Sequence, residues 1–210
     1  DKKRDTIRVA AYASIAMHWM PEILYRFRRV CPNIDVDLRM VNNAIEPFEL
    51  LEKGRTDVIF AAKQAGFSCD WTSLCQDAMY AILPPDYPLD GQETFPIEAF
   101  EGKEFLMPYG KFDLDVKAAL AANNVKPKIR PCHVDDETVI RMVGKGLGLS
   151  MMAEMMIRGR TNGVTAVPIE PATGRELGMG LHMRESMPDG ILRLRECVLA
   201  FIGTLPGTES

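Results

Sequence analysis

The first third of the chain contains two consecutive strand–helix–strand patterns, and they restrict the possible folds more than any other feature. Residues 6–11 are rich in β-forming side chains, and residues 15–31 place apolar side chains at helical spacing. Residues 34–41 alternate apolar and polar side chains, whereas residues 57–62 are almost entirely apolar, as in a central strand of a parallel sheet. These patterns predict an open α/β architecture, in which small ligands bind at the carboxyl ends of the strands.

The rest of the chain continues to alternate predicted strands and helices. A short helix is expected after Asn43, because Asn43 and Glu46 have capping-box spacing, and the proline-rich residues 84–88 are the best candidate for a boundary. Further extended segments are expected at 79–83, 104–107, 128–132, 147–152, 164–169 and 176–184, and further helices at 96–100, 112–122, 135–145 and 192–205. The sequence therefore predicts a second α/β portion, without an internal sequence repeat.

The composition is that of a globular protein without a nucleic-acid surface of its own. The 210 residues suffice for one large or two small α/β lobes, and the net charge of −4 does not favour a nucleic-acid-binding face. No segment reaches the roughly 18 apolar residues of a membrane-spanning helix. Five irregularly spaced cysteines indicate reduced thiols in a cytoplasmic protein, with a disulfide between Cys69 and Cys75 as the less favoured alternative.

No pattern in the sequence is specific for catalysis or for a metal. The glycines of residues 144–148 resemble a dinucleotide-binding run, but they follow a predicted helix and precede a strand, so helix termination explains them better. Cys132, His133 and Asp135 lie close in sequence, and a strand end that leads into a helix cap is favoured there over a metal site. We therefore predict no catalytic residue, no metal and no cofactor.

Candidate ligand-binding residues lie where the predicted strands end. Ser14 follows the first strand, Asn43 follows the second, and Tyr109 follows the strand at 104–107. Ser14 could simply cap the next helix, or its hydroxyl and the free amides of that helix could also bind an anion. Met151 and Met152 belong to a methionine-rich segment that suits either a core or an adaptable pocket wall. Strand exits that converge in this way predict a ligand-binding crevice.

Four segments, taken together, resemble the effector-binding domain of LysR-type transcriptional regulators. They are IRVAA at residues 7–11 leading to Ser14, MPEILYRFRRVCPNI at 20–34, LLEKGRTDV at 50–58 and VGKGLGLSMM at 143–152. Their order and spacing make the resemblance extend over residues 6–205. At Ala153 the chain departs from the family, in which a proline is common.

The resemblance implies an α/β fold of two Rossmann-like lobes joined by two crossover segments, similar to type 2 periplasmic binding proteins. Lobe I is then expected to comprise residues 6–83 and 185–205, and lobe II residues 88–180. Residues 1–5 would be the end of a linker, and the family's N-terminal winged helix-turn-helix would be absent from this chain.

The resemblance also implies that a small-molecule effector binds between the lobes and favours one of their arrangements. Lys63 could neutralise a carboxylate, so a small organic or aromatic acid is the favoured effector. The expected effector-binding residues are Ser14, Ile15, Asn43, Lys63, Met107, Pro108, Tyr109, Met151 and Met152.

The expected macromolecular partners are a second copy of the chain and, for the full-length protein, DNA. A two-fold dimer is expected through the outer face of helix 15–31 and the half-exposed strand 34–41, and a tetramer in the full-length protein. DNA contacts would belong only to the absent upstream domain, and no membrane partner is expected.

Two alternatives remain open from the sequence. A periplasmic solute-binding protein would share the two-lobed architecture, but it would rarely carry five unpaired cysteines. An enzyme of similar fold would need a cluster of titratable residues in the crevice, and the sequence pattern does not assemble one.

Overall fold

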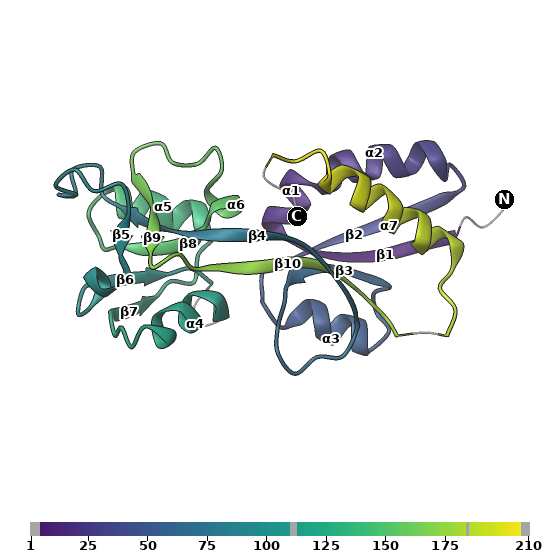
Figure 1. Cartoon of the computed structure of the whole chain (residues 1–210), viewed down its shortest axis with the longest axis horizontal. Helices are drawn as coiled ribbons and strands as arrows, with labels where there is room; N and C mark the ends of the chain where they lie inside the picture. Colours follow the sequence, from purple (N-terminus) through teal and green to yellow (C-terminus); the bar gives the residue numbers. More distant parts are fainter. Residues whose placement is uncertain (1–4, 110–112, 184, 207–210) are drawn as a thin grey trace. The chain divides into compact units, whose positions relative to one another are not determined.

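The structure, a computed structural model, describes residues 5–109, 113–183 and 185–206. It is a mixed α/β fold in which parallel and antiparallel strands are flanked by helices (Figure 1). The α/β class predicted from the alternating patterns is therefore confirmed.

The chain divides into two compact units. Unit 1 comprises Asp1–Cys75 and Glu176–Ser210, and unit 2 comprises Gln76–Arg175. Both divisions fall inside strands, namely β4 (Asp70–Leu83) and β10 (Gly174–Leu181), which continue from one unit into the other. The proline-rich residues predicted as a boundary lie within unit 2.

Unit 1 is built on a sheet whose strand order is β2-β1-β3-β10. Strand β1 (Asp5–Tyr12) pairs in parallel with both β2 (Ile34–Val41) and β3 (Val58–Ala62), while β10 is antiparallel to β3. All five residues of β3 are buried, and β2 alternates exposed with half-buried residues. The predicted contrast between a central strand and a half-exposed strand is confirmed, and β2 forms the edge of this order.

Helices cover both faces of the unit 1 sheet (Figure 1). Helices α2 (Met20–Val30) and α7 (Asp189–Ile202) pack together on one face, and α3 (Glu46–Glu52) lies on the other. The Trp19 and Phe201 rings meet edge to face with their centroids 6.4 Å apart, and the Arg26 guanidinium lies 5.6 Å from the Phe201 centroid. These contacts attach the C-terminal helix to the N-terminal part of the chain.

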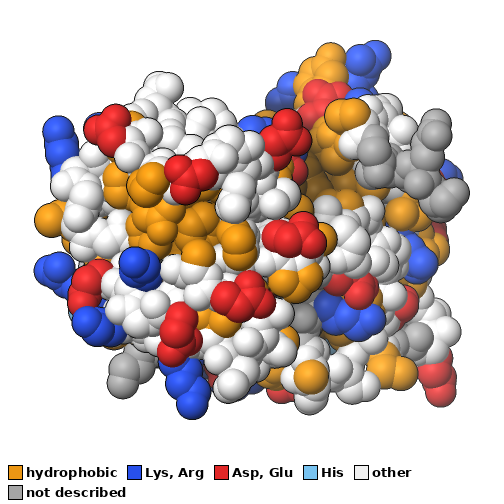
Figure 2. Space-filling model, turned by 60° about the vertical axis from the view of Figure 1, so that its left-hand side comes forward, with side chains coloured by type: hydrophobic (Ala, Val, Ile, Leu, Met, Phe, Trp, Pro, Cys, Tyr) orange, Lys and Arg blue, Asp and Glu red, His pale blue; other side chains and the backbone are white. Residues whose placement is uncertain are grey.

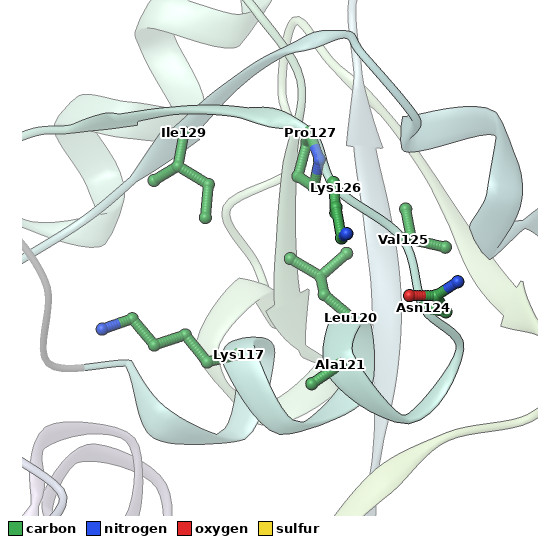
Figure 3. Close-up of a pocket in the computed structure, with 8 residues that line it drawn as sticks. All are labelled: Lys117, Leu120, Ala121, Asn124, Val125, Lys126, Pro127 and Ile129. Atoms are coloured by element: carbon green, nitrogen blue, oxygen red, sulfur yellow. The ribbon is translucent and has the colours of Figure 1, made fainter.

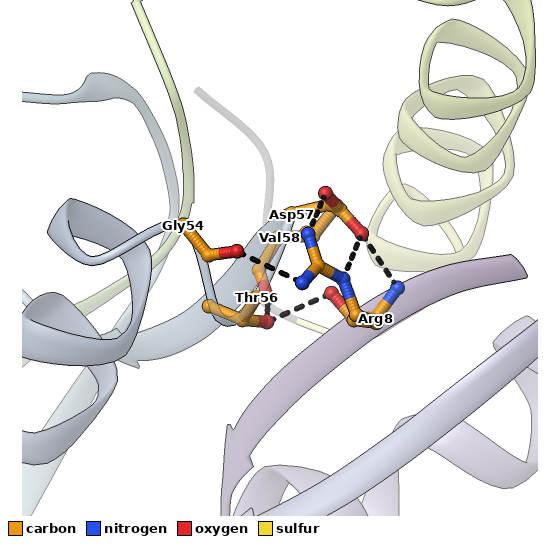
Figure 4. A network of polar contacts seen from close by, with 5 residues as sticks. All are labelled: Arg8, Gly54, Thr56, Asp57 and Val58. Atoms are coloured by element: carbon orange, nitrogen blue, oxygen red, sulfur yellow. Dashed lines mark hydrogen bonds and ion pairs between the residues drawn. The ribbon is translucent and has the colours of Figure 1, made fainter.

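Arg8, in the middle of β1, binds the residues that lead into β3 in unit 1 (Figure 4). Its guanidinium donates to both carboxylate oxygens of Asp57, at 3.0 and 2.8 Å, and to the Gly54 carbonyl oxygen at 2.8 Å. The Thr56 hydroxyl donates to the Arg8 carbonyl at 2.8 Å. A bidentate pair of this kind fixes the relative position of two strands more strongly than a single contact would.

Unit 2 combines two groups of strands. The part of β4 in this unit pairs antiparallel with β8 (Ser150–Ala153) and β9 (Thr165–Glu170), and β9 pairs in parallel with β5 (Phe95–Pro96). A separate parallel pair consists of β6 (Glu104–Met107) and β7 (Lys128–Pro131). The helices are the 3-10 helix η1 (Ile97–Phe100), α4 (Leu114–Ala122), α5 (Asp136–Gly144) and α6 (Glu154–Ile157).

Three phenylalanines in tilted and edge-to-face contact lie in the unit 2 core. The Phe100 ring lies 4.8 Å from the Phe95 ring and 5.3 Å from the Phe105 ring, measured between centroids. Phe100 and Phe105 are fully buried, and Phe95 is 2% exposed. This core packs η1, β5 and β6 against the part of β4 that lies in unit 2.

The single helix predicted at residues 15–31 is wrong, because the structure divides it. Helix α1 (Ala13–His18) ends at Trp19, and α2 begins immediately afterwards with Pro21 in its first turn. Proline has no N–H to donate to the preceding turn, and its ring clashes with the carbonyl four residues earlier. Apolar periodicity continues through the break, which explains why the pattern alone predicts one helix.

Strand β4 is much longer than the predicted strand at 79–83. Its first part, residues 70–78, carries charged and amide side chains and few buried positions, so it lacks the apolar pattern of a strand. The buried strand predicted at 147–152 is confirmed only at its end, since β8 begins at Ser150 and Leu147 is 49% exposed. Gly146 has φ of 74°, in agreement with the predicted helix termination there.

The surface carries both signs of charge. On the face shown in Figure 2, Lys and Arg side chains are interspersed with Asp and Glu around apolar areas, and they do not gather into one basic region. None of the helices in the described part of the chain has the length and apolar character needed to cross a bilayer.

Candidate functional site

The predicted binding residues of unit 1 all follow strands of its parallel β2-β1-β3 group. Ser14 and Ile15 follow β1, Asn43 follows β2, and Lys63 follows β3. Since parallel strands end at the same edge of a sheet, these residues share the carboxyl edge. The Tyr12 hydroxyl donates to the Ala44 carbonyl at 3.2 Å and connects two of the exits.

The capping role predicted for Ser14 is wrong. Helix α1 has Tyr12 at its N-cap position without a side-chain capping bond, and Ser14 is already the second residue of the helix. Ser14 is 9% exposed and Ile15 is fully buried. The chain enters the helix two residues earlier than predicted, because Ala13 is as good a helix former as the residues that follow.

Asn43 makes a local turn instead of the predicted capping box. Its Oδ1 accepts hydrogen bonds from the backbone N–H of Ile45 at 2.9 Å and of Glu46 at 3.4 Å. The Glu46 carboxylate accepts from Arg39 at 3.0 Å, so the reciprocal bond of a capping box is not made. The side chain of Asn43 thus shapes the loop at the exit of β2.

Lys63 lies at the exit of β3 and pairs with Glu176. Its Nζ is 3.5 Å from the Glu176 carboxylate, which also accepts from the Trp71 indole N–H at 2.9 Å. The Trp71 hydrogen bond, and after it Ser73 and Lys63, lower the pKa of Glu176, so this carboxylate is ionised at neutral pH. The positive charge of Lys63 is therefore partly offset within unit 1.

The predicted residues of unit 2 lie at the ends of β6 and β8. Met107 and Pro108 are buried, and Tyr109 is half-buried with φ of 51°, a left-handed backbone conformation. The Tyr109 backbone N–H donates to the Val134 carbonyl at 3.0 Å, which holds the exit of β6 beside the start of α5. Met107 belongs to the unit 2 core.

Met151 and Met152 lie in β8 and point into two different apolar clusters of unit 2. Both are fully buried; Met151 packs with the phenylalanine core, and Met152 packs with Val139 and Ile140 of α5. The methionine-rich segment thus supplies core contacts to both sides of the strand.

A cluster of carboxylates that sequence reasoning missed surrounds Tyr109 and the starts of α4 and α5. Asp113 caps α4 by accepting from the Val116 N–H at 3.1 Å, and Asp135 caps α5 by accepting from the Thr138 N–H at 2.9 Å. Asp136 is only 6% exposed, and its Oδ1 has no hydrogen-bond partner within the described ranges. The sequence predicts a helix start at these residues, correctly, but nothing in it indicates that Asp136 is buried.

Burial dominates the titration of this cluster. Burial, and after it the charge of Asp113, raise the pKa of Asp136 to about 6 against the opposing effects of Arg160 and Arg175. Burial likewise raises the pKa of Asp113, and it raises the pKa of Tyr109 to about 12. The Asp136 backbone N–H donates to the Tyr109 hydroxyl, so the phenol and this carboxyl are neighbours.

Arg175 is the buried cation of the cluster. Its Nε and Nη2 donate to Asp77 Oδ2 at 3.0 and 2.9 Å, and its Nη1 lies 3.7 Å from Asp115. Asp77 Oδ1 also accepts from the Met155 backbone N–H at 3.0 Å. The arginine thus connects the start of β10 to β4 and α4.

The described part of the chain contains no group of three or more His, Cys, Asp or Glu side chains that could hold a metal ion. All five cysteines, Cys69 and Cys75 among them, are free thiols, so the alternative disulfide is absent from this structure. Cys132 is buried, and its thiol lies 3.5 Å from the Arg130 carbonyl.

A groove of about 450 Å³ lies on unit 2 between α4 and the segment that leads into β7. Figure 3 shows Leu120 and Ala121 on the helix side and Pro127 and Ile129 on the strand side. The full lining consists of Lys117, Leu120, Ala121, Asn124, Val125, Lys126, Pro127 and Ile129. It is an apolar surface bordered by two lysines.

Residues 1–202 match a protein family described as the LysR substrate binding domain. Among curated relatives, the HTH-type transcriptional regulator TtuA of Agrobacterium vitis is 25% identical over 178 residues, which cover 81% of this chain and 58% of that protein. The probable HTH-type transcriptional regulator LrrA of Synechococcus elongatus is 25% identical over 79% of this chain and 53% of its own length. The chain thus spans little more than half the length of these relatives.

Solved structures share the fold at low sequence identity. The regulatory domain of CcmR from Synechocystis PCC6803 in complex with 2-PG has a TM-score of 0.82 at 18% identity, covering 97% of this chain and all of that one. The BenM effector-binding domain with its effector benzoate has a TM-score of 0.82 at 19% identity. The match covers 98% of this chain and 96% of that one. The effector-binding domain of QuiR in complex with shikimate has a TM-score of 0.81 at 13% identity. The match covers 96% of this chain and 98% of that one. The predicted type 2 periplasmic-binding-protein-like fold is therefore confirmed.

Proposed function

Because the chain belongs to the LysR substrate-binding domain family, we propose that it is the ligand-sensing regulatory domain of a LysR-type transcription factor. In this proposal the domain binds a small-molecule effector and transmits its presence to DNA-binding domains elsewhere in the full-length protein. The observation that carries the proposal is the family match over residues 1–202. The small molecules named with the similar CcmR, BenM and QuiR domains support the choice of a small-molecule effector.

In this proposal the effector binds to strand-exit residues of the domain. A ligand that prefers one conformation of the domain shifts the population toward it, by at most its difference in affinity for the two conformations. Strands β4 and β10 are the covalent connections through which the chain passes between the units. Hinge residues in such connections can absorb the change in backbone angles that a rearrangement requires.

A ligand screen tests the proposed function. We expect some metabolites to raise the melting temperature of the 210-residue chain, since binding to the folded state alone stabilises it.

A substitution at Ser14 tests whether the ligand binds at the exit of β1. Ser14→Ala should keep the fold, because Ser14 is not the helix cap. It should weaken the affinity for a ligand that accepts or donates at Ser14 by about tenfold, measured by calorimetric titration. Thr6→Ala, an exposed change at the opposite end of β1, is the matched control. A screen across metabolite classes that finds no binder would refute the proposal.

We also propose that the domain associates with a second copy through α2 and β2 of unit 1. Tyr25 and Val30 on α2 and Met40 on β2 are all at least half exposed. Strand β2 forms the edge of the unit 1 order, and exposed strand edges are normally covered. The expected counterpart on the second copy is the groove of unit 2, whose lysines complement the exposed Asp35 and Asp37 of β2.

Light scattering tests the self-association. The wild-type chain should be a dimer at tens of micromolar, and Val30→Glu combined with Met40→Glu should convert it to a monomer, because two charges would be buried without partners. Leu147→Glu, a change of the same kind at an exposed apolar residue of unit 2, should leave the dimer intact. A wild-type chain that is monomeric throughout this concentration range would disprove the proposed interface.

A further inference from the structure

Negative charge exceeds positive charge in the polar cluster of unit 2. Its members are the carboxylates of Asp77, Asp113, Asp115, Asp135 and Asp136 and the guanidiniums of Arg160 and Arg175. They come from β4, from the starts of α4 and α5, from the residues after α6 and from β10. Even with both arginines counted, the described side chains leave this region acidic.

Most members of the cluster already have an assigned contact. Arg175 is held by Asp77 and Asp115. Asp113 and Asp135 accept from the backbone at the starts of α4 and α5. Asp136 differs from them, because it is 6% exposed and its Oδ1 lacks a hydrogen-bond partner in the described part of unit 2.

A buried carboxylate oxygen without a hydrogen-bond donor is unfavourable, and a donor that reached Oδ1 would recover part of that free energy. The carboxyl of Asp136 has its pKa raised to about 6, mainly by burial and next by Asp113. It is therefore still ionised at neutral pH, where a positively charged donor is a better partner than a neutral one. A protonated amine supplies both the positive charge and the hydrogen-bond donor that Oδ1 lacks.

We propose that Asp136 binds a protonated amine of the effector, with the neighbouring Tyr109 hydroxyl as a second polar contact. This inference rests on the proposed effector-binding function and names the chemical class of ligand that these residues of unit 2 select. It is compatible with a carboxylate elsewhere on the same molecule.

Matched compounds test the proposal. The probes are the common L-amino acids and aliphatic diamines, each compared with the analogue in which hydroxyl or hydrogen replaces one amine. We expect that compounds stabilising the wild-type chain carry an amine, and that the hydroxyl analogue binds at least tenfold more weakly. Asp136→Asn, which keeps the shape and removes the charge, should weaken amine binding at least tenfold. Glu137→Gln, at the exposed neighbour that pairs with Arg141, should not change it.

The pH dependence of wild-type binding provides a measurement that needs no variant. Only the ionised form of Asp136 attracts an ammonium, so affinity should fall as the pH drops through about 6. Between about pH 7.5 and about pH 5 the loss should be about tenfold, which is the fall in the ionised fraction of a group with this pKa. Tyr109, Asp113, Asp135, Arg160 and Arg175 also face Asp136. Among these groups, Asp113 could broaden the transition.

The outcomes separate this inference from the proposed function. Binding of acids or alcohols that equals binding of the matched amines, or amine binding that is independent of pH and of Asp136→Asn, would overturn the amine assignment while leaving effector binding in place. If no compound of any class binds the wild-type chain, the proposed function fails and the inference fails with it.

Discussion

Arg175→Met is expected to lower the free energy of unfolding by about 3–5 kcal/mol, because it removes one partner of a buried ion pair. The Arg175 side chain is 8% exposed and that of Asp77 is 5% exposed, so the remaining carboxylate could not be solvated by water. Asp115, 3.7 Å from the same guanidinium, would lose its cation as well. Chemical denaturation followed by circular dichroism measures the change.

Arg141→Met is the matched control for this substitution. Arg141 also pairs with a carboxylate, that of Glu137, but its side chain is 77% exposed. Exposed pairs four residues apart on a helix contribute about 0.3–0.5 kcal/mol, so this variant should differ little from wild type. A loss as small for Arg175→Met as for Arg141→Met would mean that water enters the cluster, and the argument from buried charge would not hold.

Phe100→Ala is expected to lower the free energy of unfolding by about 3–5 kcal/mol, as deletion of a buried aromatic ring does elsewhere. Phe100 is fully buried between the rings of Phe95 and Phe105. The variant loses the transfer free energy of the ring and leaves a cavity that two rigid neighbours cannot fill. Phe100→Leu should cost less because it retains more of the volume. Equal losses for alanine and leucine would show that the ring contacts matter more than the volume.

Hydrogen exchange can locate the effect of Phe100→Ala. The three rings belong to unit 2, so amides of β6 and β9 should lose protection first. Simultaneous loss of protection in β1 and β3 would indicate that the two units unfold as one cooperative system.

The local pattern of apolar and polar residues predicts those elements of this chain in which the apolar residues are the buried ones. Strands β2 and β6 have the predicted bounds, because strict alternation in the first and an apolar run in the second leave no competing structure. The first part of β4 escapes prediction because its polar side chains find their partners far away in sequence, as Trp71 does with Glu176. Long-range partners of this kind are not visible in a local window.

The same limit applies to the candidate site. The strand exits that carry Ser14, Asn43 and Tyr109 follow from the order of strands, and the sequence predicts that order. Asp136 lies in the first turn of α5, as the helix predicted at 135–145 implies. What sets it apart is its burial against Tyr109 and Asp113, and burial is a property of the folded chain.

Because strands β4 and β10 pass between the units, the two units cannot be completed in the order in which the ribosome synthesises their residues. Unit 2 is one uninterrupted stretch, Gln76–Arg175, whereas unit 1 needs both Asp1–Cys75 and Glu176–Ser210. Strand β10, the partner of β3, and helix α7, which packs on α2, are translated after unit 2. Since domains fold during synthesis as their residues emerge, unit 2 can be complete while unit 1 still waits for its final strand and helix. Residues 1–75 of unit 1 therefore wait through the synthesis of all of unit 2 before their last strand and helix can pack on them.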